Sequence, residues 1–313
     1  MTEERILARI AELFYIYGIS QYDIAKKFNF SKAKVCRLIK EAKAKNIIEF
    51  NIKKYDKRLI GLERQMESSF GLKEAVIYQN LNIKRMGKDY LFEEIGAMGA
   101  RYIERILKDN ISIAIGPGKT IYHIIKNVEV KKKKKINIFS TLGGITLTKA
   151  EYQNNDLVQM LADKIGGTSH PIYLPLIFEK EEFKSQLLKD EYVNNSLKKP
   201  SKINYYIAGV GPSNKKSRYY TLGYFDSEFI QKLEEKGICG EIGLNFYDID
   251  GNFVSTGMEN RIINLNIEDI KKTQNKIITA FGDDKVIPLK GLLKTNIPDV
   301  LITDSKTAQA ILK

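Results

Sequence analysis

The chain has 313 residues, of which 43% are hydrophobic, and it carries a formal net charge of +13 at pH 7. This composition excludes a disordered chain and is sufficient for one small and one large domain. The positive charge indicates an anionic partner. More than half of the excess lies in residues 1–58, which hold 14 Lys and Arg against 7 Asp and Glu. The sequence therefore predicts a basic N-terminal domain.

Only two cysteines, Cys36 and Cys239, are present, and they lie far apart in the sequence. A disulfide framework is therefore excluded, and His123 and His170 do not complete a metal-ligand pattern with them. We expect no metal and no cofactor. No apolar run reaches transmembrane length, and the N-terminus is charged rather than built like a signal peptide. We expect a reduced, cytoplasmic protein that has no membrane partner.

The first part of the chain has the apolar spacing of short helices. Three helices are predicted, over residues 3–17, 21–28 and 32–45. Ser20 and Ser31 are the expected N-terminal caps of the second and third helices, and Asn46 is a C-terminal cap. A short strand is predicted over residues 47–52. A linker helix follows over residues 56–70.

The rest of the chain alternates strands and helices, and several strands are continuous apolar runs, as in a parallel sheet buried on both faces. Strands are predicted over residues 75–78, 111–115, 136–140, 171–174, 203–210, 241–247, 276–280 and 300–303, and helices over 89–107, 120–127, 156–165, 227–236, 285–293 and 305–312. Asp250-Gly251 is typical of a hairpin turn. The predicted fold is α/β. An all-α helix-turn-helix domain (residues 1–55) and a linker helix (56–71) precede a larger, mostly parallel sheet domain (72–313).

The third helix is the candidate DNA-reading element. Its outward face carries six cations against a single acid, and its inward face is apolar. A helix fits the major groove, where Arg37 can contact guanine with two hydrogen bonds while lysines contact phosphates. Residues near the N-terminal end of this helix should lie closest to the bases. The alternative is a merely solvated basic helix, but the caps, the charge and the three-helix spacing agree in favouring DNA binding.

Residues 19–42, ISQYDIAKKFNFSKAKVCRLIKEA, resemble the helix-turn-helix of the SorC family of sugar-responsive transcriptional regulators. Three positions depart from the family pattern: Ser20 replaces Thr, Phe28 replaces Leu and Cys36 replaces Ser. The basic helix and the resemblance together give the expected DNA-contacting residues: Gln21, Ser31, Lys32, Lys34, Cys36, Arg37 and Lys40. The expected partner is double-stranded operator DNA.

Glycines cluster directly after three predicted strands, at 116–118, 143–144 and 209–211. Ligands of open α/β folds gather at the carboxyl ends of strands, and glycine lets backbone N–H groups approach an anion at a helix N-terminus. These loops predict a phosphate or polyol pocket, although any single glycine pair is also compatible with an ordinary turn. A P-loop would require glycine at Ile113, and a dinucleotide-binding fingerprint would require it at Ile121. Both nucleotide motifs are therefore excluded.

These glycine loops also resemble the SorC-family sugar-binding domain in order and spacing, as do residues 237–242, 248–251, 280–285 and 300–308. The resemblance implies a fold like those of glucosamine-6-phosphate deaminase and ribose-5-phosphate isomerase, with a phosphorylated sugar as effector. Pro117, Lys119 and Phe281 depart from the usual family residues. The expected effector-binding residues are Gly116, Gly118, Lys119, Thr120, Gly143, Gly144, Gly211, Glu241 and Lys285. From the residues alone, Lys285 is also compatible with a surface lysine, and Glu241 with a paired strand acid.

Two functions remain to be compared. The first is a DNA-binding transcriptional regulator, without catalytic residues, that is controlled by a sugar or sugar phosphate. The second is a sugar-phosphate isomerase or deaminase with an appended DNA-binding domain, and fold alone cannot separate the two. An isomerase needs a positioned general base; Glu241 is one candidate, but no His–carboxylate pair is evident in the sequence. Regulation is the simpler interpretation. Because operators are bound by two-fold assemblies, we expect a homodimer or a homotetramer.

Overall fold

The structure is a computed structural model that describes residues 3–48, 57–80, 83–144, 152–197 and 202–313. The chain divides into two compact units, Met1–Asp56 and Lys57–Lys313. Each unit has its own hydrophobic core.

The N-terminal unit contains three helices: α1 (Glu3–Tyr15), α2 (Gln21–Phe28) and α3 (Lys32–Ala44). Ser20 and Ser31 cap α2 and α3 as predicted, because their hydroxyl oxygens accept from the amides of Asp23 and Lys34. Asn46 has a φ of 52°, the left-handed conformation expected just beyond a helix C-terminus.

The predicted strand over residues 47–52 is not formed at its start. Ile47 and Ile48 are not extended in a sheet; they pack instead against a small apolar cluster that includes Leu7 and Ala42. Residues 49–52 lie outside the described residues. The two isoleucines therefore extend the core of the helical unit, which explains their apolar pattern.

The C-terminal unit is built on a seven-stranded, fully parallel sheet with the order β1-β10-β9-β5-β2-β3-β4. The strands are β1 (Glu74–Tyr78), β2 (Ile111–Ile115), β3 (Ile136–Ser140), β4 (Thr168–His170), β5 (Tyr205–Ala208), β9 (Asn275–Thr279) and β10 (Val300–Asp304). The mostly parallel α/β class predicted from the sequence is confirmed.

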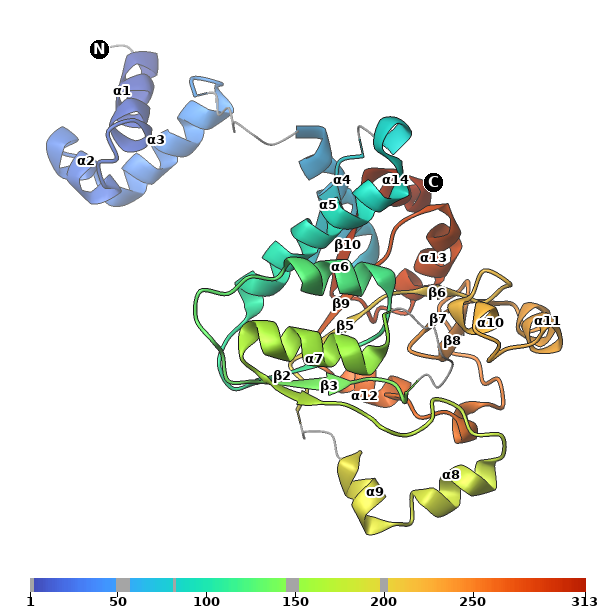
Figure 1. The fold of residues 1–313 in the computed structure, drawn as a ribbon. Helices are drawn as coiled ribbons and strands as arrows, with labels where there is room; N and C mark the ends of the chain where they lie inside the picture. The colour runs from blue at the N-terminus through green and yellow to red at the C-terminus, as the bar shows by residue number, and fades with distance from the viewer. Residues whose placement is uncertain (1–2, 49–56, 81–82, 145–151, 198–201) are drawn as a thin grey trace. The chain divides into compact units, whose positions relative to one another are not determined.

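Helices cover both faces of this sheet (Figure 1). One apolar cluster joins the sheet to α5 (Ile83–Ile106), α6 (Lys119–Asn127) and α7 (Asn154–Ile165). A second cluster joins the opposite face to α4 (Lys57–Phe70), α12 (Ile267–Lys272), α13 (Val286–Lys294) and α14 (Ser305–Leu312). The helix expected as a linker, α4, packs on β1 and α14, with Met66 fully buried.

A smaller antiparallel sheet of β6 (Gly211–Pro212), β7 (Ile238–Ile242) and β8 (Asn245–Asp248) branches off after β5. It packs with α10 (Arg218–Thr221) and α11 (Ser227–Glu235) around a third apolar cluster. Between β4 and β5 the chain forms α8 (Glu181–Leu187) and α9 (Glu191–Ser196), which lie at the lower edge of Figure 1. Two 3-10 turns, Glu259–Arg261 and Asp283–Lys285, complete the described elements.

Two predicted strands were wrong. Residues 171–174 do not form a strand; the strand lies just before them, as β4 (Thr168–His170). It ends at His170 because Pro171 has no N–H to donate to the neighbouring strand. The single strand expected over residues 241–247 is the β7–β8 hairpin. Gly243 and Leu244, with φ values of 56° and 59°, form a tight turn that the apolar leucine conceals in the sequence.

The centre of the sheet is a topological switch point. From β2 the chain continues to β3 on one side, whereas from its neighbour β5 it continues to β9 on the other. The loops at the carboxyl ends of β2 and β5 therefore separate, and a crevice opens between them. Ligands of open α/β sheets bind at such a crevice.

Candidate functional site

The N-terminal unit presents a basic surface on α3. The core of this unit includes Ile10, Ile24, Val35 and Ile39. Ser31, Lys32, Lys34, Arg37 and Lys40 are exposed, whereas Gln21 and Cys36 are partly buried. The predicted DNA-contacting residues therefore lie on or beside α3, and the cations point away from the core.

Two features of this unit were not predicted. The ammonium group of Lys34 lies 3.9 Å from the centre of the Phe30 ring, a cation–π contact that orients it. Tyr22 on α2 is 68% exposed. Its exposure could have been predicted from the sequence, because Tyr22 lies outside the apolar stripe of α2. An exposed aromatic side chain is available for contact with a partner.

A cavity of about 980 Å³ lies at the switch point of the C-terminal unit. We call it the switch-point cavity. Its volume suits a small-molecule ligand. Seven of the nine predicted effector residues line it: Gly116, Gly118, Lys119, Thr120, Gly211, Glu241 and Lys285.

The loop after β2 leads directly into the N-terminus of α6. Gly116 donates its N–H to the carbonyl oxygen of Ile207 on β5, which holds the loop across the switch point. Gly118, the N-cap residue of α6, has a φ of 144° and supplies no side-chain acceptor to the first turn. The first N–H groups of a helix have no partner within the helix, and their dipole favours an anion. This end of the cavity is therefore suited to a phosphate or carboxylate.

Lys119 lies beside this helix N-terminus. Its ammonium group donates to Asp89 Oδ1 at 2.7 Å and lies 4.3 Å from the centre of the Phe92 ring. Hydrogen bonding to Lys119 lowers the pKa of the exposed Asp89 carboxyl. An anion that binds at the α6 N-terminus would compete with Asp89 for this lysine.

The opposite wall carries Glu241, which is buried on β7. Its Oε2 accepts from the N–H of Leu244 at 2.8 Å. Burial raises the pKa of Glu241. Gly211 pairs with Glu241 across β6 and β7 and leaves room for the carboxyl group, because a Cβ at Gly211 would clash with Oε1. Gly211 and Glu241, both named as candidate effector residues from the sequence, thus lie against each other in the cavity wall.

Lysine and arginine side chains border the same region. Lys285 is partly buried, and burial lowers the pKa of its ammonium group, which lies 3.6 Å from Asp284 Oδ2. Arg218 donates to the carbonyl oxygen of Tyr152 at 3.2 Å, and burial lowers the pKa of its guanidinium group. Lys216 also lines the cavity. Sequence reasoning missed Lys216 and Arg218; the signal was a basic cluster directly after the 209–211 glycine loop.

Gly143 and Gly144 do not line the switch-point cavity. Gly144 donates its N–H to Leu174 O at 2.7 Å and accepts from the N–H of Leu176 at 3.0 Å. A Cβ at Gly143 would lie 2.7 Å from the carbonyl oxygen of Pro175. In the described structure, these glycines therefore serve close backbone packing.

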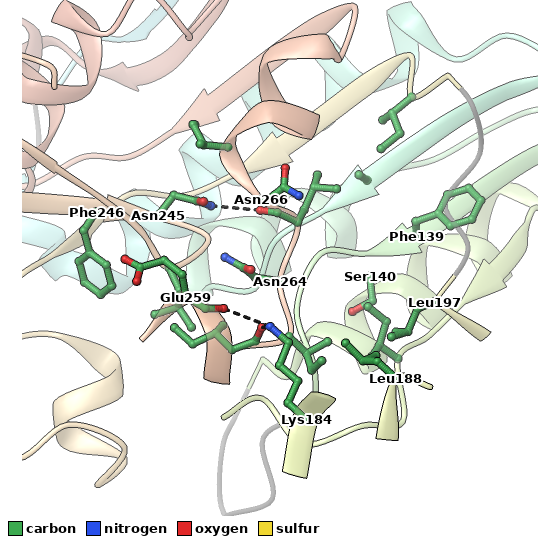
Figure 2. A pocket seen from close by; sticks show the side chains of 18 of the residues that line it. Phe139, Ser140, Lys184, Leu188, Leu197, Asn245, Phe246, Glu259, Asn264 and Asn266 are labelled. Atoms are coloured by element: carbon green, nitrogen blue, oxygen red, sulfur yellow. Dashed lines mark hydrogen bonds between the residues drawn. The ribbon is translucent and has the colours of Figure 1, made fainter. Parts of the chain in front are cut away.

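A second cavity of about 730 Å³ lies between α8, α9 and the segment from Leu244 to Ile267 (Figure 2). Lys184 lines this cavity, and its ammonium group donates to the carbonyl oxygens of Glu259 and Ile262 at 3.1 and 2.7 Å. The Glu259 carboxylate accepts from Thr256 and Ser255, and burial lowers the pKa of His170. Because these groups are already engaged or held neutral, the second cavity is less suited to an anion.

No group of three or more His, Cys, Asp and Glu side chains within the described ranges is arranged to hold a metal ion. No helix in the described part of the chain is long and apolar enough to cross a membrane.

A basic three-helix module and an α/β unit with a ligand-sized cavity at its switch point define a class of protein: a DNA-binding regulator that senses a small molecule. Residues 56–313 match the family model described as "Putative sugar-binding domain". The chain belongs to this family of sugar-binding domains, found in SorC-type transcriptional regulators.

The similarity to known proteins extends over nearly the whole chain. The deoxyribonucleoside regulator of Bacillus subtilis (strain 168) is 26% identical over 310 residues, which cover 99% of this chain and 98% of the relative. The sorbitol operon regulator of Klebsiella pneumoniae is 23% identical over 316 residues, covering 99% and 98%. The crystal structure of full-length SorC from Klebsiella pneumoniae has a TM-score of 0.73 at 22% identity and covers 99% of both chains. The protein is therefore a sugar-responsive, DNA-binding transcriptional regulator, as predicted.

Proposed function

We propose that the effector is a phosphorylated sugar and that it binds in the switch-point cavity. The N-terminus of α6, which opens into the cavity behind Gly118 without a side-chain cap, is the observation that carries this proposal. Its backbone N–H groups, with the Thr120 hydroxyl, offer several donors to a phosphate, and Lys119 adds charge. A neutral polyol would gain little from this arrangement.

The sugar then extends from α6 toward β7. Glu241 and Lys285 border that part of the cavity, together with Arg218. The hydroxyl groups of a sugar can donate to a carboxyl group, and ammonium and guanidinium groups can donate to its hydroxyl and carbonyl oxygens. We propose that these side chains orient the sugar.

Thermal-shift measurements on the full chain test this proposal, with free sugars paired with their phosphates. A ligand that binds only the folded state adds about 2.7 kcal/mol at a hundred times its dissociation constant. We expect stabilisation by phosphorylated members only, and a loss of stabilisation in Lys285→Ala. Lys290→Ala is the matched control, since Lys290 lies on α13 outside the cavity lining. Stabilisation by free sugars alone would contradict the proposal.

We further propose that the protein acts as a homodimer or homotetramer on operator DNA, contacted by Arg37 and the other exposed cations of α3. One helix-turn-helix reads too few base pairs for genomic specificity, and a two-fold assembly doubles the site. Light scattering at micromolar concentration tests this. A monomer both with and without DNA would refute it.

We propose that the chain is not a sugar-phosphate isomerase or deaminase. The relatives compared are transcriptional regulators. Within the described lining of the switch-point cavity there is no histidine, and the carboxyl group of Glu241 is bound to a backbone N–H. Incubation with aldose and ketose phosphates, followed by product analysis, tests this; turnover that is lost in Glu241→Gln would overturn it.

A further inference from the structure

Two buried hydroxyl groups border the switch-point cavity without a partner. Tyr206 at the centre of β5 is 0% exposed, and Thr279 at the end of the neighbouring β9 is 1% exposed. Among the described residues, neither hydroxyl oxygen has a hydrogen-bond partner. Native proteins leave few buried polar groups unsatisfied, because the desolvated group then loses its hydrogen bond to water without replacement. Such groups at a cavity wall indicate a ligand that completes them.

The phenol of Tyr206 is directed toward the wall that carries Glu241. The ring is part of the apolar cluster between the sheet and α13. Its hydroxyl oxygen would lie 3.0 Å from a Cβ at Gly243, in the turn that joins β7 to β8. Gly243 and Glu241 both line the cavity. A side chain at Gly243 would therefore press against the Tyr206 hydroxyl, and glycine permits the close approach.

Tyr247 shows how this fold treats a buried tyrosine that does not line the cavity. It is also 0% exposed, on the adjacent hairpin strand β8. Its hydroxyl donates to the carbonyl oxygen of Pro288 at 3.1 Å. The two tyrosines share their burial and their apolar cluster and differ in this hydrogen bond. Of these two tyrosines, the one without a hydroxyl partner among the described residues is the one that lines the cavity. The hydroxyl of Thr303 on β10 is also unpartnered within the described structure, away from the cavity, so the comparison is confined to the tyrosine pair.

We infer that Tyr206 is a specificity-determining residue, whose hydroxyl forms a hydrogen bond with a hydroxyl group of the bound sugar at the inner end of the cavity. This inference rests on the proposal that a sugar occupies the switch-point cavity. It narrows the effector class to compounds that carry a hydroxyl group on the Glu241 side when their phosphate lies at α6. Inorganic phosphate lacks this group and gains nothing from Tyr206.

Tyr206→Phe and Tyr247→Phe in the full chain form the matched pair for the test. Without ligand, Tyr206→Phe should unfold at or above the wild-type temperature, because no hydrogen bond is lost, whereas Tyr247→Phe should unfold at a lower temperature. Calorimetric titrations use pentose 5-phosphates, hexose 6-phosphates, the corresponding free sugars and inorganic phosphate as probes. Tyr206→Phe should bind the sugar that wild type prefers about threefold to tenfold more weakly, as expected for one hydrogen bond. Tyr247→Phe should bind it with unchanged affinity.

Deoxy analogues of the preferred sugar identify the hydroxyl group. One analogue should bind wild type more weakly and bind Tyr206→Phe no more weakly than the parent sugar does. Unchanged affinity of Tyr206→Phe for every probe would overturn the inference, as would a loss of unfolding temperature equal to that of Tyr247→Phe. If wild type binds free sugars and not their phosphates, the proposed phosphate site fails, while the comparison on the free sugar still decides the role of Tyr206. If no sugar binds wild type, both ideas fail.

Discussion

The contact between Gly211 and Glu241 gives a direct test of how the cavity wall is built. In Gly211→Ala the new Cβ would clash with Glu241 Oε1 and lie 2.8 Å from its Cδ. Glu241 is buried, and its other oxygen is held by the Leu244 N–H, so it cannot move aside without losing that bond. Overpacking costs about 1–3 kcal/mol, and a hydrogen bond to a carboxylate contributes about 1.5–3 kcal/mol. We expect a loss of about 2–4 kcal/mol in the free energy of unfolding of the C-terminal unit.

Urea unfolding followed by circular dichroism measures this loss. Gly209→Ala is the matched control in the same loop, because its Cβ would meet only the carbonyl oxygen of Thr279, at 3.6 Å. Its effect should stay below about 1 kcal/mol, since alanine also restricts the unfolded chain. The loop composition is then equal in both variants, and the difference between them reports the steric contact.

A double-mutant cycle identifies Glu241 as the clashing partner. Gly211→Ala combined with Glu241→Ala should be less destabilising than the sum of the single variants, by at least about 1 kcal/mol, because truncation of the acid removes the clash. The reasoning is refuted if Gly211→Ala is no more destabilising than Gly209→Ala. It is refuted equally if the two changes are additive.

Three other predictions concern separate parts of the chain. Arg37→Ala should weaken operator binding by about 1–3 kcal/mol and relax base specificity, and Lys43→Ala should do less; fluorescence anisotropy with operator and scrambled duplexes measures this, and equal operator affinity for wild type and Arg37→Ala contradicts it. Ser31→Ala removes the hydroxyl that caps the Lys34 N–H and should destabilise the N-terminal unit by about 1 kcal/mol in thermal unfolding; an unchanged unfolding temperature contradicts this. The raised pKa of Glu241 means that protonation stabilises the fold, so stability from this group is complete below its unfolded pKa of about 4.3 and falls as pH rises through the folded value. The stability of Glu241→Gln relative to wild type should therefore increase with pH above about 4.3, and parallel pH profiles would count against this.

The parallel strands and most helices could be predicted because their signals are local. Ile111–Ile115 and Ile136–Ser140 are mostly apolar segments between turn residues, and the structure has strands with these bounds. Ser31 identifies the start of α3 by its capping chemistry. The short helices α8 and α9 give no comparable signal, because α8 has no buried residue and therefore no apolar stripe to detect.

The hairpin at β7 and β8 shows how a local signal misleads. Residues 241–247 contain four apolar side chains, which favours one strand, and Leu244 is not a residue expected at a positive φ. Its buried side chain contributes to the third apolar cluster, so tertiary packing outweighs the turn preference. Sequence periodicity cannot register that cluster, because its members come from segments as distant as Leu142 and Met258.

One part of the candidate site could be predicted from consecutive residues, and the other part could not. The Gly116–Thr120 loop was recognisable because a strand end, glycines and a helix start are consecutive in the chain. The opposite wall depends on pairs that are 30 and 37 residues apart: Gly211 makes room for Glu241, and Gly243 lies against the Tyr206 hydroxyl. Such a pair is defined by the absence of a side chain at one position and the presence of a polar group at the other, and neither residue alone differs from an ordinary turn glycine or core tyrosine. The part of the cavity that we propose holds an anion is therefore encoded locally, whereas the part that would distinguish one sugar from another is encoded by the fold.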